Sequence, residues 1–131
     1  MDLNLTKTRI TDAGLAHLAT LSELRVLYLD SDKITGKGLV HLRRLPHLEQ
    51  LSLTRTWIGN AELQSLRGLT SLTSLNLSDT SIDDDGIEAL CRMPGLKTLR
   101  LHGTDVTEQG MHRLEQTLPN CNVSHQPKRE E

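Results

Sequence analysis

The stretch Leu72–Gly95, LTSLNLSDTSIDDDGIEALCRMPG, is the unit that the rest of the chain repeats. Steps of 24 residues from Leu72 lead back to Leu48 and Leu24 and forward to Leu96. A fixed period of this kind predicts a solenoid in which each repeat forms one layer. The two central leucine columns are Leu3, Leu27, Leu51, Leu75 and Leu99, followed by Leu5, Leu29, Leu53, Leu77 and Leu101.

Each repeat changes its hydrophobic period halfway along. The run Leu75–Leu77 alternates apolar and polar residues, which predicts a half-buried strand. Ile87, Leu90 and Met93 then follow at intervals of three, which predicts one face of a helix. Residues able to cap a helix stand between the two halves, namely Thr11, Thr35, Gly59 with Asn60, Asp83 and Thr107.

Stacking such units predicts an α/β fold. Successive strands form one parallel sheet with right-handed crossovers, and the short helices form a second layer. Because helices are wider than the strand spacing of about 4.8 Å, we expect a curved solenoid with the sheet on its concave side and the helices on its convex side.

The repeats resemble the leucine-rich repeat family. The family pattern L-x-x-L-x-L-x-x-N/C-x-L is matched over Leu24–Ile34 and its copies. The segment Thr8–Leu15, TRITDAGL, is similar to the 24-residue bacterial and cytoplasmic variants, which include ribonuclease-inhibitor-like and cysteine-containing repeats. The family's Asn or Cys position holds Thr8, Asp32, Thr56, Thr80 and Thr104. A Thr hydroxyl can still bond neighbouring backbone groups, whereas ionised Asp32 has no donor.

We expect one domain over residues 1–124, with about five repeats and a final edge strand near Asn122–Ser124 that turns Cys121 or Val123 inward. Residues 125–131 are charged and predicted to be disordered. The chain opens inside a repeat, at Leu3. Because terminal layers of a solenoid need a polar outer face, we expect further repeats or a capping domain ahead of Met1, or another cover on this end.

Composition narrows the class of partner and the compartment. The formal net charge is −2, and outward charges are mixed in sign, which argues against nucleic-acid binding. Aromatic residues make up 2% of the chain and Phe is absent, as a leucine-layered core allows. The N-terminus lacks a signal-peptide pattern and no run is long enough for a membrane span. With two cysteines at unrelated repeat positions, we predict a cytoplasmic location.

An acidic segment resembles a calcium loop but departs from it. Oxygen ligands alternate over Asp79–Asp85 as in an EF-hand. The glycine required at the sixth place is Asp84, and the twelfth place, normally Glu, is Leu90. Helix capping accounts for these acids, so we predict no metal and no cofactor.

Histidines raise the question of catalysis. His102 is predicted on the concave strand face, beside Ser78 and Asp79. A nucleophile, base and acid need mutual contact and an oxyanion hole, which an open sheet does not provide. We therefore predict that the chain is not an enzyme.

The outward strand positions and adjoining loops are the candidate binding surface. Tyr, Trp and Arg are common anchors of protein interfaces. We predict a protein or peptide partner on this concave face. The alternative without a function is that the outward strand residues are only solvated polar positions. Two further alternatives are a structural segment of a larger multidomain protein and a substrate-recognition adaptor of a ubiquitin-ligase-like or signalling assembly. The candidate residues are Tyr28, Asp30, Gln50, Arg55, Trp57, Asn76, Asp79, Arg100 and His102.

Overall fold

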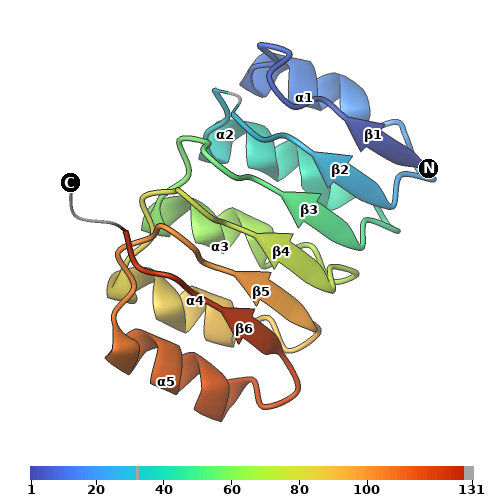
Figure 1. Cartoon of the computed structure of the whole chain (residues 1–131). Coiled ribbons are helices and arrows are strands. Elements are labelled where there is room, and N and C mark those ends of the chain that lie inside the picture. Colours follow the sequence, from blue (N-terminus) through green and yellow to red (C-terminus); the bar gives the residue numbers. More distant parts are fainter. Residues whose placement is uncertain (32, 129–131) are drawn as a thin grey trace.

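The computed structural model describes residues 1–31 and 33–128; Asp32 and residues 129–131 lie outside the described part. Its strands form one six-stranded parallel sheet whose spatial order follows the chain (Figure 1). The strands are β1 (Asp2–Asn4), β2 (Val26–Tyr28), β3 (Gln50–Ser52), β4 (Ser74–Asn76), β5 (Thr98–Arg100) and β6 (Asn122–Ser124). Stacked repeats produce this arrangement, in which each strand lies next to the strands of the preceding and following repeats.

Short helices cover one face of the sheet (Figure 1). They are α1 (Asp12–Leu18), α2 (Gly36–Leu39), η1 (Val40–Arg44), η2 (Asn60–Glu62), α3 (Leu63–Leu66), η3 (Asp84–Gly86), α4 (Ile87–Cys91) and α5 (Glu108–Thr117), where η marks a 3₁₀ helix. This architecture confirms the predicted α/β solenoid, with the sheet on the concave side and the helices on the convex side.

The core consists of aligned leucines between the two layers. Leu27, Leu51 and Leu75 occupy the same register position on neighbouring strands, and none is more than 2% exposed. The backbone ladder runs past the strand ends, since Leu29 N donates to Ser52 O over 3.0 Å. Each layer is therefore held to the next by backbone hydrogen bonds and by the burial of like side chains.

The chain leaves the sheet through a left-handed residue in each of the first five layers. The φ values are positive at Lys7 (58°), Ser31 (64°), Arg55 (61°), Asp79 (57°) and Gly103 (69°). A left-handed conformation costs a non-glycine residue on the order of 1–2 kcal/mol. Four of these five positions carry a side chain, so the surrounding ladder must hold them there.

The helix caps are joined from layer to layer by acids and amides. Asp12 accepts bonds from Thr35 N (2.8 Å) and Thr35 Oγ1 (2.6 Å) of the next layer. Asp84 accepts from the corresponding groups of Thr107. The predicted side-chain capping is confirmed at Thr35, Asp83 and Thr107, whereas Thr11 makes no such bond. The same three capping residues are also tied to the preceding repeat.

These links determine where glycine is needed. A Cβ on Gly38 or Gly110 would collide with Asp12 Oδ1 or Asp84 Oδ1, respectively, of the preceding layer. In both cases the glycine lies 26 residues after the acid. The glycine of the T-D-x-G pattern is therefore required by the neighbouring repeat's side chain.

Between the second and third repeats the two residue types are exchanged, so that glycine comes first and the longer side chain follows. Gly36 stands where the other caps have an acid or amide, and Glu62, 26 residues later, stands where they have glycine. A Cβ on Gly36 would lie 2.8 Å from Glu62 Cγ. Glu62 occupies the vacated space, and its Oε2 accepts a 2.8 Å bond from Gly59 N. The departure in this repeat is a matched exchange.

The threonine column works within layers. The Oγ1 atoms of Thr56 and Thr80 donate to Leu53 O (2.7 Å) and Leu77 O (2.6 Å), three residues earlier. The predicted bonding of Thr to nearby backbone is confirmed, but these hydroxyl bonds stay inside each repeat, and the inter-layer ladder is made by backbone groups.

The last repeat absorbs a one-residue shift. Leu118 and Cys121 form the same turn as the preceding repeats, since Cys121 N donates to Leu118 O over 3.0 Å, but both stand one residue late. Val123 nevertheless pairs with Leu99, in the 24-residue register. The extra residue is offset by a shorter approach to β6, and both Cys121 and Val123 pack against the core.

The segment after β6 continues along the sheet. Gly103 N donates to Gln126 O over 2.7 Å, and Lys128 Nζ lies 3.0 Å from Asp105 Oδ2. The tail was predicted to be disordered from His125; residues 129–131 of it lie outside the described part.

Replacing Leu75 with Ala is expected to destabilise the chain by about 2–5 kcal/mol, because Leu75 is fully buried between layers on both sides. Leu3→Ala should cost far less, since Leu3 is only partly buried. Denaturant unfolding of both variants tests this. Equal losses would show that the first layer is covered in solution.

Gly110→Ala is expected to destabilise by about 1–3 kcal/mol, because the added methyl collides with Asp84. In an Asp84→Ala background this cost should fall to near zero, since Ala is the better helix residue. Gly95→Ala, whose new Cβ lies 3.6 Å from Leu72 O, is the matched control. Additive effects in the double-mutant cycle would disprove the coupling.

Candidate functional site

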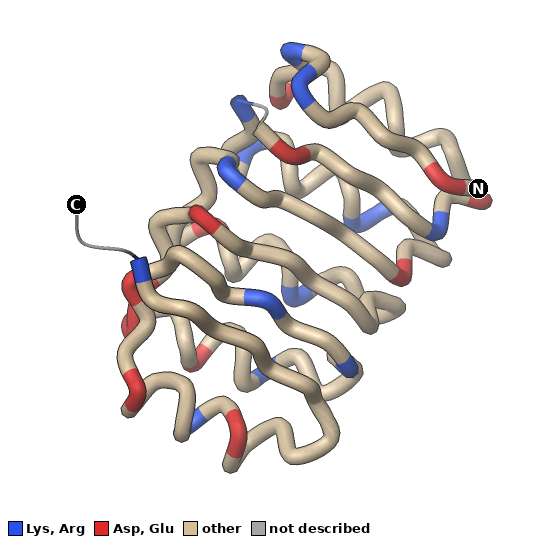
Figure 2. The backbone as a smooth tube through the Cα atoms, viewed as in Figure 1, with Lys and Arg blue, Asp and Glu red and all other residues tan. Residues whose placement is uncertain are grey.

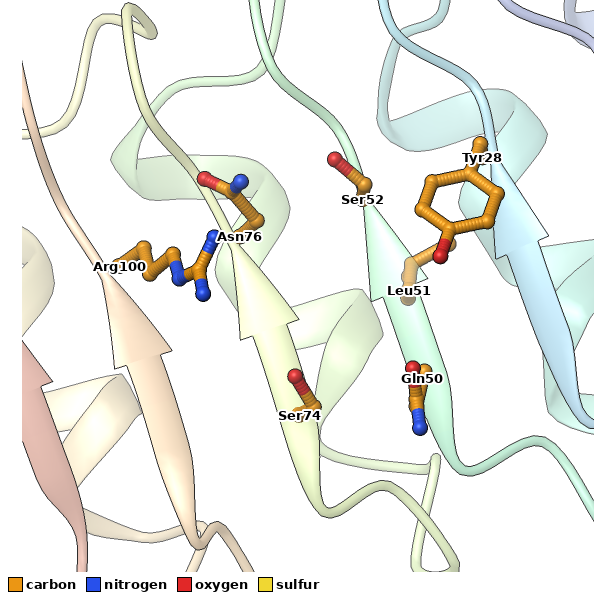
Figure 3. A pocket seen from close by; sticks show the side chains of 7 residues that line it. All are labelled: Tyr28, Gln50, Leu51, Ser52, Ser74, Asn76 and Arg100. Carbon is orange, nitrogen blue, oxygen red and sulfur yellow. The ribbon is translucent and has the colours of Figure 1, made fainter.

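The sheet face, meaning the side of the sheet turned away from the helices, holds an open hollow across β2 to β5 (Figure 3). Its volume is about 180 Å³. Four candidate residues meet there, together with three others. The lining consists of Tyr28, Gln50, Leu51, Ser52, Ser74, Asn76 and Arg100.

Some side chains in and beside the hollow already make hydrogen bonds within the chain. Asp30 Oδ1 accepts bonds from the Ser52 hydroxyl and from Thr54 N (3.0 Å), which ties the second layer to the third. Asn76 Oδ1 accepts from Ser78 N over 3.1 Å within one layer. Asp30 is therefore a structural acceptor beside the hollow, whereas Asn76 keeps its Nδ2 group free of this bond.

Arg100 is committed to no such bond. Its side chain extends from β5 toward β4 and Asn76 (Figure 3). Within residues 1–31 and 33–128, its guanidinium has no ion pair or hydrogen-bond partner. Among the described residues that line the hollow, only Arg100 is charged.

A second group of candidates lies on the rim, defined as the loop positions that follow the strands. Trp57 is 64% exposed, and Lys33 Nζ lies 5.7 Å from its ring centroid. Arg55 Nε lies 3.6 Å from Asp79 Oδ2, and both side chains are exposed. Such a pair contributes little to stability. The rim columns are Lys7, Ser31, Arg55, Asp79 and Gly103, and Arg9, Lys33, Trp57, Ser81 and Asp105.

Charge on the rim changes sign along the stack. Bases predominate in the first layers and acids in the later ones (Figure 2). The rim columns therefore form no continuous basic stripe over the described residues, and the prediction that the chain does not bind nucleic acid stays a prediction.

His102 lies apart from the first hollow. With Asp79, Gly103 and the segment 126–128 it lines another open hollow, of about 320 Å³. Its Nδ1 atom is buried without a hydrogen-bond partner in the described part of the chain. Neither Asp79 nor Ser78 bonds the imidazole there, so the three predicted neighbours do not form a catalytic chain in this structure.

Two hollow residues escaped the sequence prediction. Ser74 is one 24-residue step from Gln50, and Ser52 is one step from Tyr28, so column position could have identified both. Their small hydroxyls gave no signal of their own. They matter because short side chains leave space between Tyr28 and Arg100.

The acidic segment is occupied by capping. Asp83 Oδ1 accepts from Asp85 N over 2.9 Å and from Asn60 Nδ2 over 2.6 Å. Among the described residues, no group of three or more His, Cys, Asp or Glu side chains is placed to hold a metal ion. The same residues include no helix of the length and apolarity that a bilayer crossing requires.

Among the described residues, three ionisable groups have clearly shifted pKa values. The hydrogen bond from Arg25 to Glu49 (2.7 Å) lowers the pKa of the Glu49 carboxyl and raises that of the guanidinium. Burial raises the pKa of the Cys121 thiol, which disfavours its reactive thiolate. Cys121 and Cys91 are both free. The cytoplasmic location stays a prediction.

Comparison with known protein families identifies the repeats by their sequence as well as by their fold. Residues 46–106 match the model of the leucine rich repeat family. The layers on both sides of this segment keep its strand register. The matched segment consists of leucine-rich repeats, and the described chain as a whole has the solenoid fold of leucine-rich repeat proteins. The match covers the family as a whole, so the bacterial or ribonuclease-inhibitor-like subtype remains a prediction. No curated protein sequence matches the chain.

Solved structures share the fold. A leucine-rich repeat protein from Leptospira interrogans is similar over 83% of this chain, with a TM-score of 0.58 and 19% identity; this chain spans 33% of that one. The tropomodulin C-terminal domain of Caenorhabditis elegans is similar over 91% of this chain and 82% of its own length, with a TM-score of 0.64 and 14% identity. Leucine-rich repeat domains commonly mediate protein interactions and are generally not enzymes.

Adding Ca²⁺ or Zn²⁺ is expected to leave the thermal unfolding midpoint unchanged, because the Asp83 carboxylate already accepts a capping bond and the Asp84 carboxylate a bond from the next layer. A metal that bound only the folded chain would raise the midpoint by mass action. Melts with each ion and with a chelator test this. A rise that Asp83→Ala or His102→Ala removes would show a metal site.

Proposed function

We propose that this chain is a non-enzymatic interaction module that holds a protein or peptide segment on its concave sheet face. The observation that carries the proposal is the hollow, in which side chains from four strands surround open space that no helix covers. Support from the family is an analogy at the level of fold, and the residues of the site supply the specific argument.

Exposed anchor residues on the sheet face and rim favour this proposal. Tyr28 is 40% exposed and Trp57 is 64% exposed, in a chain with only 2% aromatic residues. Buried Tyr, Trp and Arg side chains carry much of the energy of protein interfaces. Arg55 and Arg100 lie on the same side of the solenoid and complete the proposed set of anchors.

The size of the surface indicates how a partner binds. Outward side chains of successive strands stand about 4.8 Å apart, so Tyr28 and Arg100 are about 14 Å apart. A standard interface buries about 800 Å² on each partner. The hollow supplies only part of that area, so rim residues such as Trp57 must contribute as well.

A structural role in a longer array is the second candidate. In the first layer, Leu3, Leu5 and Ile10 are only partly buried, whereas their counterparts Leu27 and Leu29 are fully buried. This uneven burial favours another protein layer packed against β1.

Replacing Tyr28, Arg55, Trp57 and Arg100 together with Ala is expected to abolish capture of the partner in a pull-down from source lysate. Each residue should contribute more than about 1 kcal/mol to binding. The matched control is the convex variant His41→Ala with Arg92→Ala, which should retain the partner. Loss of the partner with the convex variant, and its retention with the concave one, would refute the proposed surface.

A further inference from the structure

We propose that the hollow binds the side-chain carboxylate of an Asp or Glu residue in the partner segment, with Arg100, Asn76 and Ser74 as its donors. This inference rests on the proposed function and specifies the chemistry of the partner at one point. It follows from which polar groups the fold has already used and which it leaves free.

The amide of Asn76 has a defined direction. Its Oδ1 atom accepts the 3.1 Å bond from Ser78 N, and an amide oxygen is the group that can do so. The Nδ2 group is therefore the end left for a guest, and it only donates. Arg100 likewise only donates, and its side chain extends toward Asn76 (Figure 3).

The other end of the hollow has mixed character, because the Tyr28 hydroxyl and the Gln50 amide can each donate and accept. The Ser52 hydroxyl donates its hydrogen bond to Asp30, so only its oxygen is left to a guest, as an acceptor. Asp30 belongs to the second layer and Arg100 to the fifth, which separates their strands by about 14 Å. That distance exceeds the Debye length of about 8 Å at physiological ionic strength, so Asp30 repels a carboxylate at Arg100 only weakly.

The hollow is therefore polar in a directed sense. Arg100 and the Nδ2 group of Asn76, which can only donate, lie at its β4–β5 side, while Tyr28 and Leu51 lie toward β2 and β3 (Figure 3). A volume of about 180 Å³ corresponds to roughly six water molecules at about 30 Å³ each, which is room for a short acidic side chain. The carboxylate would lie at Arg100, and the aliphatic stem would pack toward Tyr28.

The guest is an internal residue of its segment. Layers β1 and β6 continue the sheet face on both sides of the hollow, and a standard interface needs them. A segment that covers all the layers passes over the hollow. This favours a side-chain carboxylate over a chain terminus.

The test is an NMR titration of the full chain with acetyl-glutamate amide and with its neutral counterpart, acetyl-glutamine amide. The expected result is a saturable shift of the Asn76 Nδ2 and Arg100 Nε resonances by the glutamate probe, with at least about fivefold weaker binding of the glutamine probe. Charge-assisted hydrogen bonds are the stronger kind, which sets this preference.

Two variants locate the donors. Arg100→Gln should weaken glutamate-probe binding at least about tenfold, and Arg113→Gln, the same change on the convex helix α5, should leave it unchanged. Asn76→Asp keeps an acceptor for Ser78 N but replaces the donor with a carboxylate, so it should abolish binding. Unchanged amide dispersion in its spectrum would show that the fold is retained.

The inference is overturned if both probes bind equally, if Arg100→Gln has no effect, or if acetyl-alanine, which carries a terminal carboxylate, binds more tightly. These outcomes are separable from failure of the proposed function. If the concave quadruple variant loses its partner but the two probes bind equally, only the carboxylate inference fails. If the glutamate probe binds more tightly but the partner binds the convex face, only the proposed function fails.

Discussion

Neighbouring layers of this solenoid must stay one strand spacing apart, about 4.8 Å, and every other feature adapts to that distance. The backbone ladder fixes it on the sheet side, so inward side chains must be of one size and shape to stack without gaps. Leucine fills both central columns over the first five layers. The same constraint explains why the core contains no aromatic residue and why Tyr28 and Trp57 are on the outside.

The sequence predicted the features that repeat. Strand positions, the burial of the leucine columns and the caps at Thr35 and Asp83 follow from the 24-residue period, because equal spacing forces equal environments. The final strand was also predictable, since Val123 keeps the register although Leu118 and Cys121 do not. Period alone carried these inferences.

Features that depend on a neighbouring layer's side chain were not predictable one repeat at a time. Lys7 and Arg55 adopt a left-handed backbone without the glycine that normally reports it. Asp30 and Asn76 are both outward polar residues, but Asp30 is held by Ser52 and Thr54, whereas Asn76 keeps a free donor. The candidate site was therefore located by column, while the chemistry of each side chain required the structure.

The pairing of each cap with the repeat that follows it has a consequence for how such an array can lengthen. The first and fourth repeats each carry an acid, Asp12 or Asp84, and their own glycine two residues on, so a tandem copy of either would fit against its original. A copy of the second alone would set Gly36 against a second Gly38 and leave an empty space.

A copy of the third alone would press Asn60 against a second Glu62. Copied as a block, the two remain compatible, because Asn60 would then meet Gly38. The second and third repeats can therefore be duplicated without a mismatch only together, as a block of 48 residues, which is twice the 24-residue sequence period.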